Sequence, residues 1–165
     1  MGRSKFLAVT GILIAASACN PFRSPFKQEP VVSVSAGDVN ANSRWSGTLA
    51  SPANLVGAVQ MKGSATMTPG SNGQNTSVNV SLSNASPGGI HPWQLRRGRC
   101  GADEGVLGRT EDYKALKVDD AGRAESSVTL PLSMPSAGAY YVSVGASSAN
   151  PETIVACGNL APPSR

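Results

Sequence analysis

Histidine is almost missing from this sequence, since the 165 residues contain only one. A single imidazole cannot build a metal centre that needs several histidines. Aromatic residues make up 5% of the chain and charged residues 15%, and the formal net charge is only +4. So small a charge, without a clustered basic patch, does not indicate a nucleic-acid partner. No apolar run is long enough to span a bilayer as a helix.

The composition favours short strands joined by many turns. Glycine (18 residues) and proline (12) are frequent, and the polar residues are largely serine, threonine and asparagine. These residue types are typical of turns and strands, whereas helix formers are sparse. The length and the 40% hydrophobic content suit one domain with a modest core, preceded by a processed segment.

The N-terminus has the pattern of an export signal. Arg3 and Lys5 precede an apolar run at residues 6–18, which is shorter than a membrane-spanning helix. The run ends in Ala16-Ser17-Ala18-Cys19, which resembles the lipobox of bacterial lipoproteins, although the usual leucine is replaced by alanine. We predict a signal peptide at 1–18 and a lipidated Cys19 that anchors the chain to a membrane of the bacterial cell envelope, facing the periplasm or the exterior. An ordinary signal-peptidase site and an uncleaved anchor are the alternatives.

Three cysteines are an odd number for an exported protein. If Cys19 carries lipid, Cys100 and Cys157 remain as one pair in an oxidising compartment, where we expect a disulfide. Two free, buried thiols are the alternative. Residues 19–44 begin with a proline-rich stretch and are predicted to form a flexible tether, and residues 162–165 a tail.

Residues 45–161 are predicted to form one all-β domain. The clearest strand is 76–83, where Val78, Val80 and Leu82 alternate with polar residues after an Asn-Gly turn. Further strands are expected at 48–50, 55–61, 64–68, 113–118, 123–130, 140–144 and 153–156. A turn at 119–122 is expected to join two of these strands in a second hairpin. About eight short strands separated by turns indicate a sandwich or a barrel.

Two motifs resemble those of Cu/Zn superoxide dismutases. In that family a strand reads roughly Gly-x-His-Gly-Phe-His-x-His, and a cysteine in the next loop bridges to an Ala-Cys-Gly motif at the end of the last strand. Here Gly89-Ile90-His91-Pro92-Trp93-Gln94-Leu95-Arg96 falls on the first motif, and Val155-Ala156-Cys157-Gly158 falls on the second. The resemblance extends over about residues 55–160. It implies an eight-stranded Greek-key β-barrel of the Cu/Zn superoxide dismutase type.

The same resemblance implies that the metal site is lost. The family holds copper with four imidazoles, but Gln94 and Arg96 stand at the His-x-His positions, and Gly145 is the expected occupant of a late-strand ligand position. Glutamine is a poor copper ligand, and a guanidinium stays protonated and cannot coordinate. The family's anion-guiding arginine is replaced by Ile154. His91 falls on a position that is not a ligand, so we expect it to have a structural role and expect no cofactor.

Arg96 is predicted to occupy the former copper position. Alternation divides the side chains of this strand between two faces, with Gln94 and Arg96 on one and Trp93, Leu95 and Arg97 on the other. Gly145 is expected to leave open space opposite Arg96. The guanidinium would then either pair internally with a carboxylate or bind a small anion.

Arg96, Arg97 and Arg99 form a short basic run. It either contacts an envelope protein or an anionic polymer, or is a solvated surface balanced by nearby acids. Those acids are Asp103, Glu104, Glu111 and Asp112. The sequence thus predicts a non-catalytic, membrane-tethered superoxide dismutase-like domain with a binding or structural role. A metal-binding protein or a superoxide dismutase-related enzyme with a remodelled site is the alternative, and a subunit that borrows ligands from another chain is a third.

Overall fold

The computed structural model describes residues 43–55 and 60–163, and its regular structure is almost entirely β-strand. In this part of the chain the only helical elements are two single turns of 3-10 helix, η1 (Ala53–Leu55) and η2 (Thr110–Asp112). Neither turn has the length or the hydrophobicity to cross a lipid bilayer. The predicted all-β class is therefore confirmed. The predicted signal peptide, Cys19 and the predicted tether up to residue 42 lie outside the described residues.

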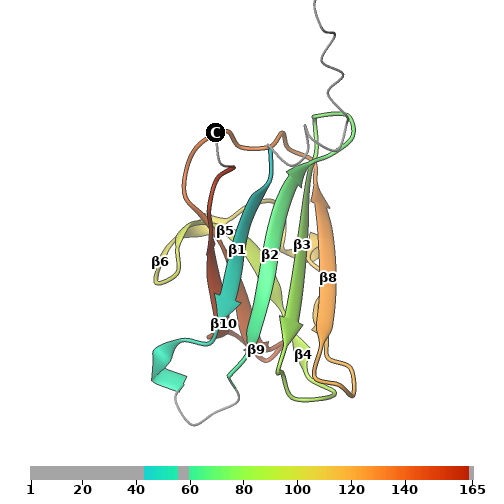
Figure 1. The fold of residues 1–165 in the computed structure, drawn as a ribbon, viewed down its shortest axis with the longest axis vertical. Helices are drawn as coiled ribbons and strands as arrows, with labels where there is room; N and C mark the ends of the chain where they lie inside the picture. Colours follow the sequence, from blue (N-terminus) through green and yellow to red (C-terminus); the bar gives the residue numbers. More distant parts are fainter. Residues whose placement is uncertain (1–42, 56–59, 164–165) are drawn as a thin grey trace, which may run out of the picture. The chain divides into compact units, whose positions relative to one another are not determined.

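One antiparallel sheet of eight strands accounts for most of the described chain, and it curls into a half-barrel (Figure 1). The strands lie side by side in the order β6-β5-β9-β10-β1-β2-β3-β8. Their bounds are β1 (Trp45–Ala50), β2 (Lys62–Pro69), β3 (Thr76–Ser83), β5 (Trp93–Arg99), β6 (Ala102–Val106), β8 (Ala124–Leu130), β9 (Tyr140–Ser147) and β10 (Asn150–Leu160). A second, two-stranded sheet pairs β4 (Ile90–His91) with β7 (Leu116–Lys117).

The hairpin formed by β2 and β3 matches the prediction from the sequence. β3 occupies the predicted residues 76–83, and its apolar side chains Val78, Val80 and Leu82 are buried. β2 pairs with β3 in an unbroken register along the full length of both strands. Gly73 in the connecting turn has a φ of 68°, a left-handed conformation that glycine adopts without steric cost. The predicted Asn-Gly turn is therefore confirmed.

The predicted strand at 55–61 is wrong where the structure describes it. Leu55 lies in η1, where its N–H donates to the carbonyl of Pro52 at 3.0 Å, and residues 60 and 61 lie in no strand. Proline has a fixed φ that suits a turn. Ser51 then closes the loop, because its N–H donates to Met61 O at 3.2 Å and its Oγ accepts from Met61 N at 2.9 Å. Local bonds thus replace the expected ladder, and residues 56–59 lie outside the described residues.

The predicted hairpin between 113–118 and 123–130 is also wrong. The connecting turn exists, but the two arms do not pair with each other. Instead β8 pairs with β3, and β7 pairs with β4. The carbonyl of Lys114 is already occupied, because it accepts hydrogen bonds from Trp93 Nε1 at 2.8 Å and from Ser126 Oγ at 2.7 Å. Side-chain hydrogen bonds therefore take the place of the ladder that the sequence pattern suggested.

The inner side of the curled sheet holds the hydrophobic core. The largest side chains that are fully withdrawn from solvent include Trp93, Leu49, Met67, Leu95, Leu116, Leu130, Val78 and Val142. Trp45 packs edge-on against Tyr140 with ring centroids 5.4 Å apart, and Trp93 packs against Tyr113 in the same way at 5.1 Å. Edge-to-face pairs add to the stabilisation that burial alone supplies. These contacts join the small number of aromatic side chains to the core.

β1 and β10 approach each other closely because each carries a glycine at the point of contact. A Cβ at Gly47 would lie 2.2 Å from Asn159 O, and a Cβ at Gly158 would lie 2.3 Å from Thr48 O. Any side chain at either position would push the two strands apart. The absence of side chains at Gly47 and Gly158 therefore allows β10 to lie close against β1.

Cys100 and Cys157 form the predicted disulfide, with their Cα atoms 6.0 Å apart across a sequence separation of 57. The bridge ties the turn between β5 and β6 to β10. Asn159 adds a second link, because its Oδ1 accepts a hydrogen bond from Cys100 N at 2.9 Å. The turn between β5 and β6 is thus fastened twice to the same strand.

Replacing Cys100 and Cys157 together by serine is expected to lower the free energy of unfolding by up to roughly 4 kcal/mol, because the unfolded chain regains the entropy that the bridge removes. Thermal unfolding with and without reductant measures the loss. Reductant should lower the melting temperature of the wild-type chain and leave that of the double variant unchanged. Equal melting temperatures for the wild type and the double variant in the absence of reductant would contradict a structural role for the bridge.

Candidate functional site

Strand β5 presents two different faces, as the alternation predicts. Trp93 and Leu95 are 1% and 0% exposed and face the core. Gln94 and Arg96 are half-buried on the outer face, where they lie opposite residues of β9. The strand that resembles the metal-binding motif therefore directs Gln94 and Arg96 to the outside of the half-barrel.

Arg96 is held by a carboxylate from the neighbouring strand β6. Its Nε donates to Asp103 Oδ1 at 2.8 Å, and its Nη2 donates to Asp103 Oδ2 at 2.6 Å, which makes a two-pronged ion pair. Its Nη1 donates to Gln94 Oε1 at 2.7 Å. The side chain of Arg96 is only 15% exposed, so the partner offsets the cost of burying a guanidinium. The expected internal pairing with a carboxylate is confirmed, and the partner is Asp103.

Two further groups hold Asp103 in place. Tyr141 of β9 donates its hydroxyl to Asp103 Oδ1 at 3.0 Å, and the N–H of Gly105 donates to the same oxygen at 3.0 Å. We call Gln94, Arg96, Asp103 and Tyr141 the Arg96 network. Its members come from β5, β6 and β9, so the network joins three adjacent strands on the outer face of the sheet.

The network shifts the pKa values of its three titratable groups. Hydrogen bonds from Arg96 and from the N–H of Gly105 hold the pKa of Asp103 well below its usual range. The hydrogen bond to Asp103 raises the pKa of Arg96 further. Burial, and then the bond to the Asp103 carboxylate, raises the pKa of Tyr141. At neutral pH the site therefore holds a charged pair beside a neutral phenol.

The expected open space at Gly145 is absent, and this expectation is wrong. A Cβ built on Gly145 would lie 2.5 Å from the carbonyl oxygen of Pro151. The first residues of β10 therefore cover Gly145, the position at which the resemblance implied a late-strand ligand. The backbone of Gly145 is also engaged, because its N–H donates to Pro92 O at 2.8 Å. A side chain of any size at this position would require β10 to move.

His91 is buried beside this glycine. Its Nδ1 lies 3.1 Å from Gly145 O, and because a carbonyl oxygen can only accept, Nδ1 carries the proton. The bond joins β4 to β9, which fits the structural role expected for this residue. Nε2 is then an acceptor, and it is buried with no hydrogen-bond partner among the described residues. The region described by the structure contains no group of three His, Cys, Asp or Glu side chains placed to hold a metal ion.

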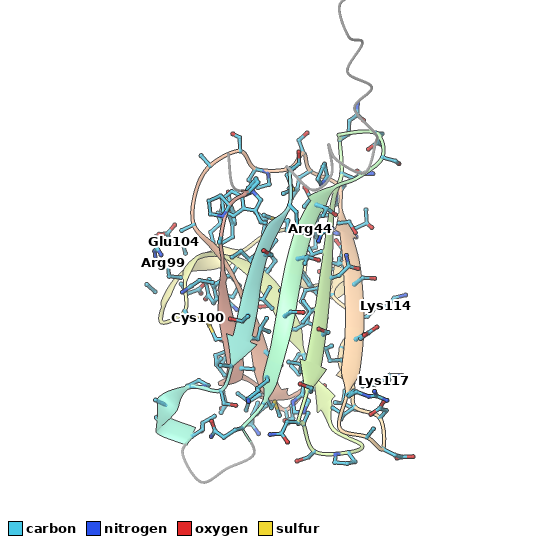
Figure 2. The ribbon with its side chains drawn as sticks, viewed as in Figure 1. Arg44, Arg99, Cys100, Glu104, Lys114 and Lys117 are labelled. Carbon is cyan, nitrogen blue, oxygen red and sulfur yellow. A yellow bond between two sulfur atoms is a disulfide. The ribbon has the colours of Figure 1, made fainter. Side chains whose placement is uncertain are left out.

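The basic run does not form one continuous surface. Arg96 is engaged in its network, whereas Arg97 and Arg99 are exposed near the end of β5. Figure 2 shows Arg99 and Glu104 projecting from the β5–β6 hairpin on the same side of the molecule. Arg109 pairs with Asp112 at 2.6 Å, so part of the predicted balance by nearby acids is present.

A groove of about 1090 Å³ lies over the Arg96 network. It follows β10 between the loop after β1 and the β5–β6 hairpin, which come from opposite sides of β10 in the strand order and both project to the left in Figure 1. Arg96, Asp103, Tyr141 and Glu152 line it together with both cysteines of the disulfide. The hollow is open to solvent and lined by both polar and apolar atoms.

Sequence reasoning missed the residues that complete this site. Asp103 was visible only as one of several acids near the basic run. A two-residue turn at Cys100-Gly101, with Gly101 at a φ of 86°, pairs Arg99 with Ala102 and brings Asp103 beside β5. That turn was the signal that would have identified the partner of Arg96. Tyr141 and Glu152 carried no comparable signal, because their positions depend on the pairing of β9 and β10.

Comparisons with protein-family models, with curated proteins and with solved structures found no significant match to this chain. Its function must therefore be argued from its own residues.

Asp103→Asn is expected to lower the melting temperature at pH 7, because it leaves the guanidinium of Arg96 without a counter-charge. The folded-state pKa of Asp103 lies below the unfolded value of about 3.9, so the carboxylate stabilises the fold above that pH, and the contribution is lost as pH falls through the folded pKa. The gap in melting temperature between variant and wild type should therefore narrow in acid, as thermal melts from about pH 7 to about pH 2 would measure.

Asp120→Asn is the matched control. Asp120 is exposed in the turn before β8 and has no ion pair among the described residues. Its substitution should leave the melting temperature almost unchanged at every pH. If the difference in melting temperature between Asp103→Asn and the wild type stays constant across the pH range, protonation of Asp103 does not contribute to the pH dependence of stability.

Proposed function

We propose that this chain is an exported, lipid-anchored protein of the bacterial cell envelope, carrying a superoxide dismutase-like domain that has no competent metal site and does not act as an enzyme. Its role is binding or structural. The observation that carries the proposal is the Arg96 network, which occupies the former ligand positions with an internally paired cation. Cys19 supplies the membrane anchor, and the folded domain faces the periplasm or the exterior.

The strand order supports the Greek-key barrel of this family. In a Greek key, three strands joined in sequence are followed by a fourth that returns to lie beside the first. The order β10-β1-β2-β3 has this form, with β10 as the returning strand. β8 similarly returns to β3 after the chain has passed through β5 and β6. The disulfide between the β5–β6 turn and β10 also matches the position implied by the resemblance.

The donor set does not fit copper. Gln94 already accepts a hydrogen bond from Arg96 through its only side-chain oxygen. Arg96 remains protonated and cannot donate a lone pair to a metal. Gly145 has no side chain, and Pro151 fills the space that an imidazole would need. No step of superoxide chemistry can be assigned to these residues.

His91 favours a second candidate, a remodelled metal site. Its buried Nε2 has a lone pair with no hydrogen-bond partner among the described residues, and unsatisfied buried nitrogens are uncommon. The further ligands would have to come from another chain or from outside the described residues. Metal content distinguishes this candidate from the first.

The purified protein, exposed to copper and zinc salts and then dialysed, is expected to retain far less than one metal ion per chain and to keep its melting temperature, because no group of ligands is assembled. Elemental analysis and thermal melts measure both quantities. One retained ion per chain that is lost in His91→Ala would overturn the proposal in favour of the remodelled site. Gly145→His serves as a control, and it should destabilise the fold without adding metal, because of the contact with Pro151.

The exposed arginines supply the proposed contact with an envelope protein or an anionic polymer. Arg97 and Arg99 form no ion pair among the described residues, so both charges are free to meet a partner. Nucleic acid is not proposed, because the net charge of +4 is small.

Cys19→Ser is expected to abolish labelling by a radioactive or alkyne-bearing palmitate in a bacterial host, because the thiol that carries the lipid is removed. The variant should move from the membrane fraction to the soluble fraction, whereas Cys100→Ser should remain labelled. A wild-type chain that is exported but never labelled would overturn the lipid anchor and favour ordinary secretion.

A further inference from the structure

The groove over the Arg96 network is lined by hydrogen-bonding groups and apolar groups in similar proportion. Its floor is β10 from Glu152 to Asn159. One wall is the loop after β1, with the hydroxyl of Ser51 and the amide of Asn54, and the other is the β5–β6 turn with Asp103. Apolar atoms contribute at least as much of the lining as polar atoms do, from residues such as Pro52, Leu55 and Ile154, so the polar groups are interspersed with apolar surface. A hydrocarbon or lipid chain would therefore leave many polar groups without partners.

The charges in the groove exclude a polyanion as its preferred ligand. Only three lining residues are charged, namely Arg96, Asp103 and Glu152. Asp103 neutralises Arg96 through two hydrogen bonds, and Glu152 adds a further negative charge. The groove therefore carries one negative charge in excess. A phosphate or sulfate group would meet two carboxylates around a cation that is already paired.

The remaining hydrogen-bonding capacity suits hydroxyl groups. Asp103 Oδ2 accepts one bond from Arg96 and keeps a lone pair, and its side chain is 42% exposed. The terminal nitrogens of Arg96 carry further protons. Thr48 and Thr153 are exposed along the same groove and can both donate and accept. Sugar hydroxyls have the same dual character, and adjacent hydroxyls can bond to a carboxylate and a guanidinium held side by side.

The groove is also held in shape before any ligand arrives. The disulfide and the bond from Cys100 N to Asn159 Oδ1 fasten one wall to the floor. Tyr141 and the N–H of Gly105 fix the carboxylate of Asp103. Groups that are already oriented lose little entropy on binding.

We infer that this groove binds a neutral, polyhydroxylated ligand, namely a short segment of a glycan chain that lies along β10 and bonds to Asp103, Arg96 and Thr153. The groove is open to solvent and its lining residues run along β10 from Glu152 to Asn159, which suits a segment of a polymer more than an enclosed small molecule. This inference concerns the residues of the groove alone and does not depend on the superoxide dismutase resemblance.

Isothermal titration of the purified protein with an N-acetylglucosamine tetramer and with a maltotetraose tests the inference. At least one should bind saturably, with a dissociation constant on the order of 1 mM or tighter. Thr153→Val, which removes one exposed hydroxyl and keeps the shape, should weaken that binding about threefold to tenfold. Thr129→Val on β8 is the matched control, because Thr129 is exposed outside the groove, and its affinity should equal that of the wild type.

Two results would overturn the inference. One is the absence of saturable binding of either glycan. The other is tighter binding of a heparin tetrasaccharide that is lost in Arg96→Gln, which would identify an anion site instead. Metal analysis of the same preparation decides the proposed function separately, so glycan binding by a metal-loaded protein would refute only the metal-free proposal.

Discussion

The ion pair between Arg96 and Asp103 is the interaction on which the outer face of this domain depends. The side chain of Arg96 is only 15% exposed, and burying its positive charge is costly unless a carboxylate lies beside it. The backbone pairing of β5 and β6 places that carboxylate beside Arg96, and Tyr141 of β9 donates to it as well. The ion pair thus adds a side-chain link to the β5–β6 hairpin, which carries one cysteine of the disulfide. Arg96, Asp103 and Tyr141 all line the groove.

The parts of the fold that depend on local pattern could be predicted from the sequence. The strand at 76–83 has strict alternation and a turn that needs a left-handed residue, and both signals act over a few residues. The disulfide followed from counting cysteines in a chain that the sequence predicts to be exported. The all-β class followed from composition. Each of these predictions needs only the residues of one short segment, the number of cysteines or the overall composition.

The failures came from bonds between distant residues. The carbonyl of Lys114 accepts from Trp93 and Ser126, which lie 21 and 12 residues away in sequence, so the expected second hairpin does not form. The space at Gly145 is filled by the backbone of Pro151, and a backbone contact leaves no mark in the residue types. Asp103 is one of several acids near the basic run, and only the register of the β5–β6 turn distinguishes it from the others as the partner of Arg96. Only the assembled sheet identifies these partners.

The proposed lack of a metal site and the proposed glycan groove both depend on Arg96. The same residue that opposes metal binding also forms part of the proposed glycan site. An imidazole in place of Arg96 would leave Asp103 without its cation and would free the carboxylate to take a metal or to move. The pair that would bond to adjacent hydroxyls, with the guanidinium donating and the carboxylate accepting, would then no longer exist. Conversely, as long as Arg96 and Asp103 remain paired, the guanidinium has no lone pair to offer a metal, and its positive charge beside Asp103 opposes the binding of a second cation there. The identity of the residue at position 96 therefore determines whether this face can bind a metal or can offer a paired guanidinium and carboxylate to hydroxyl groups.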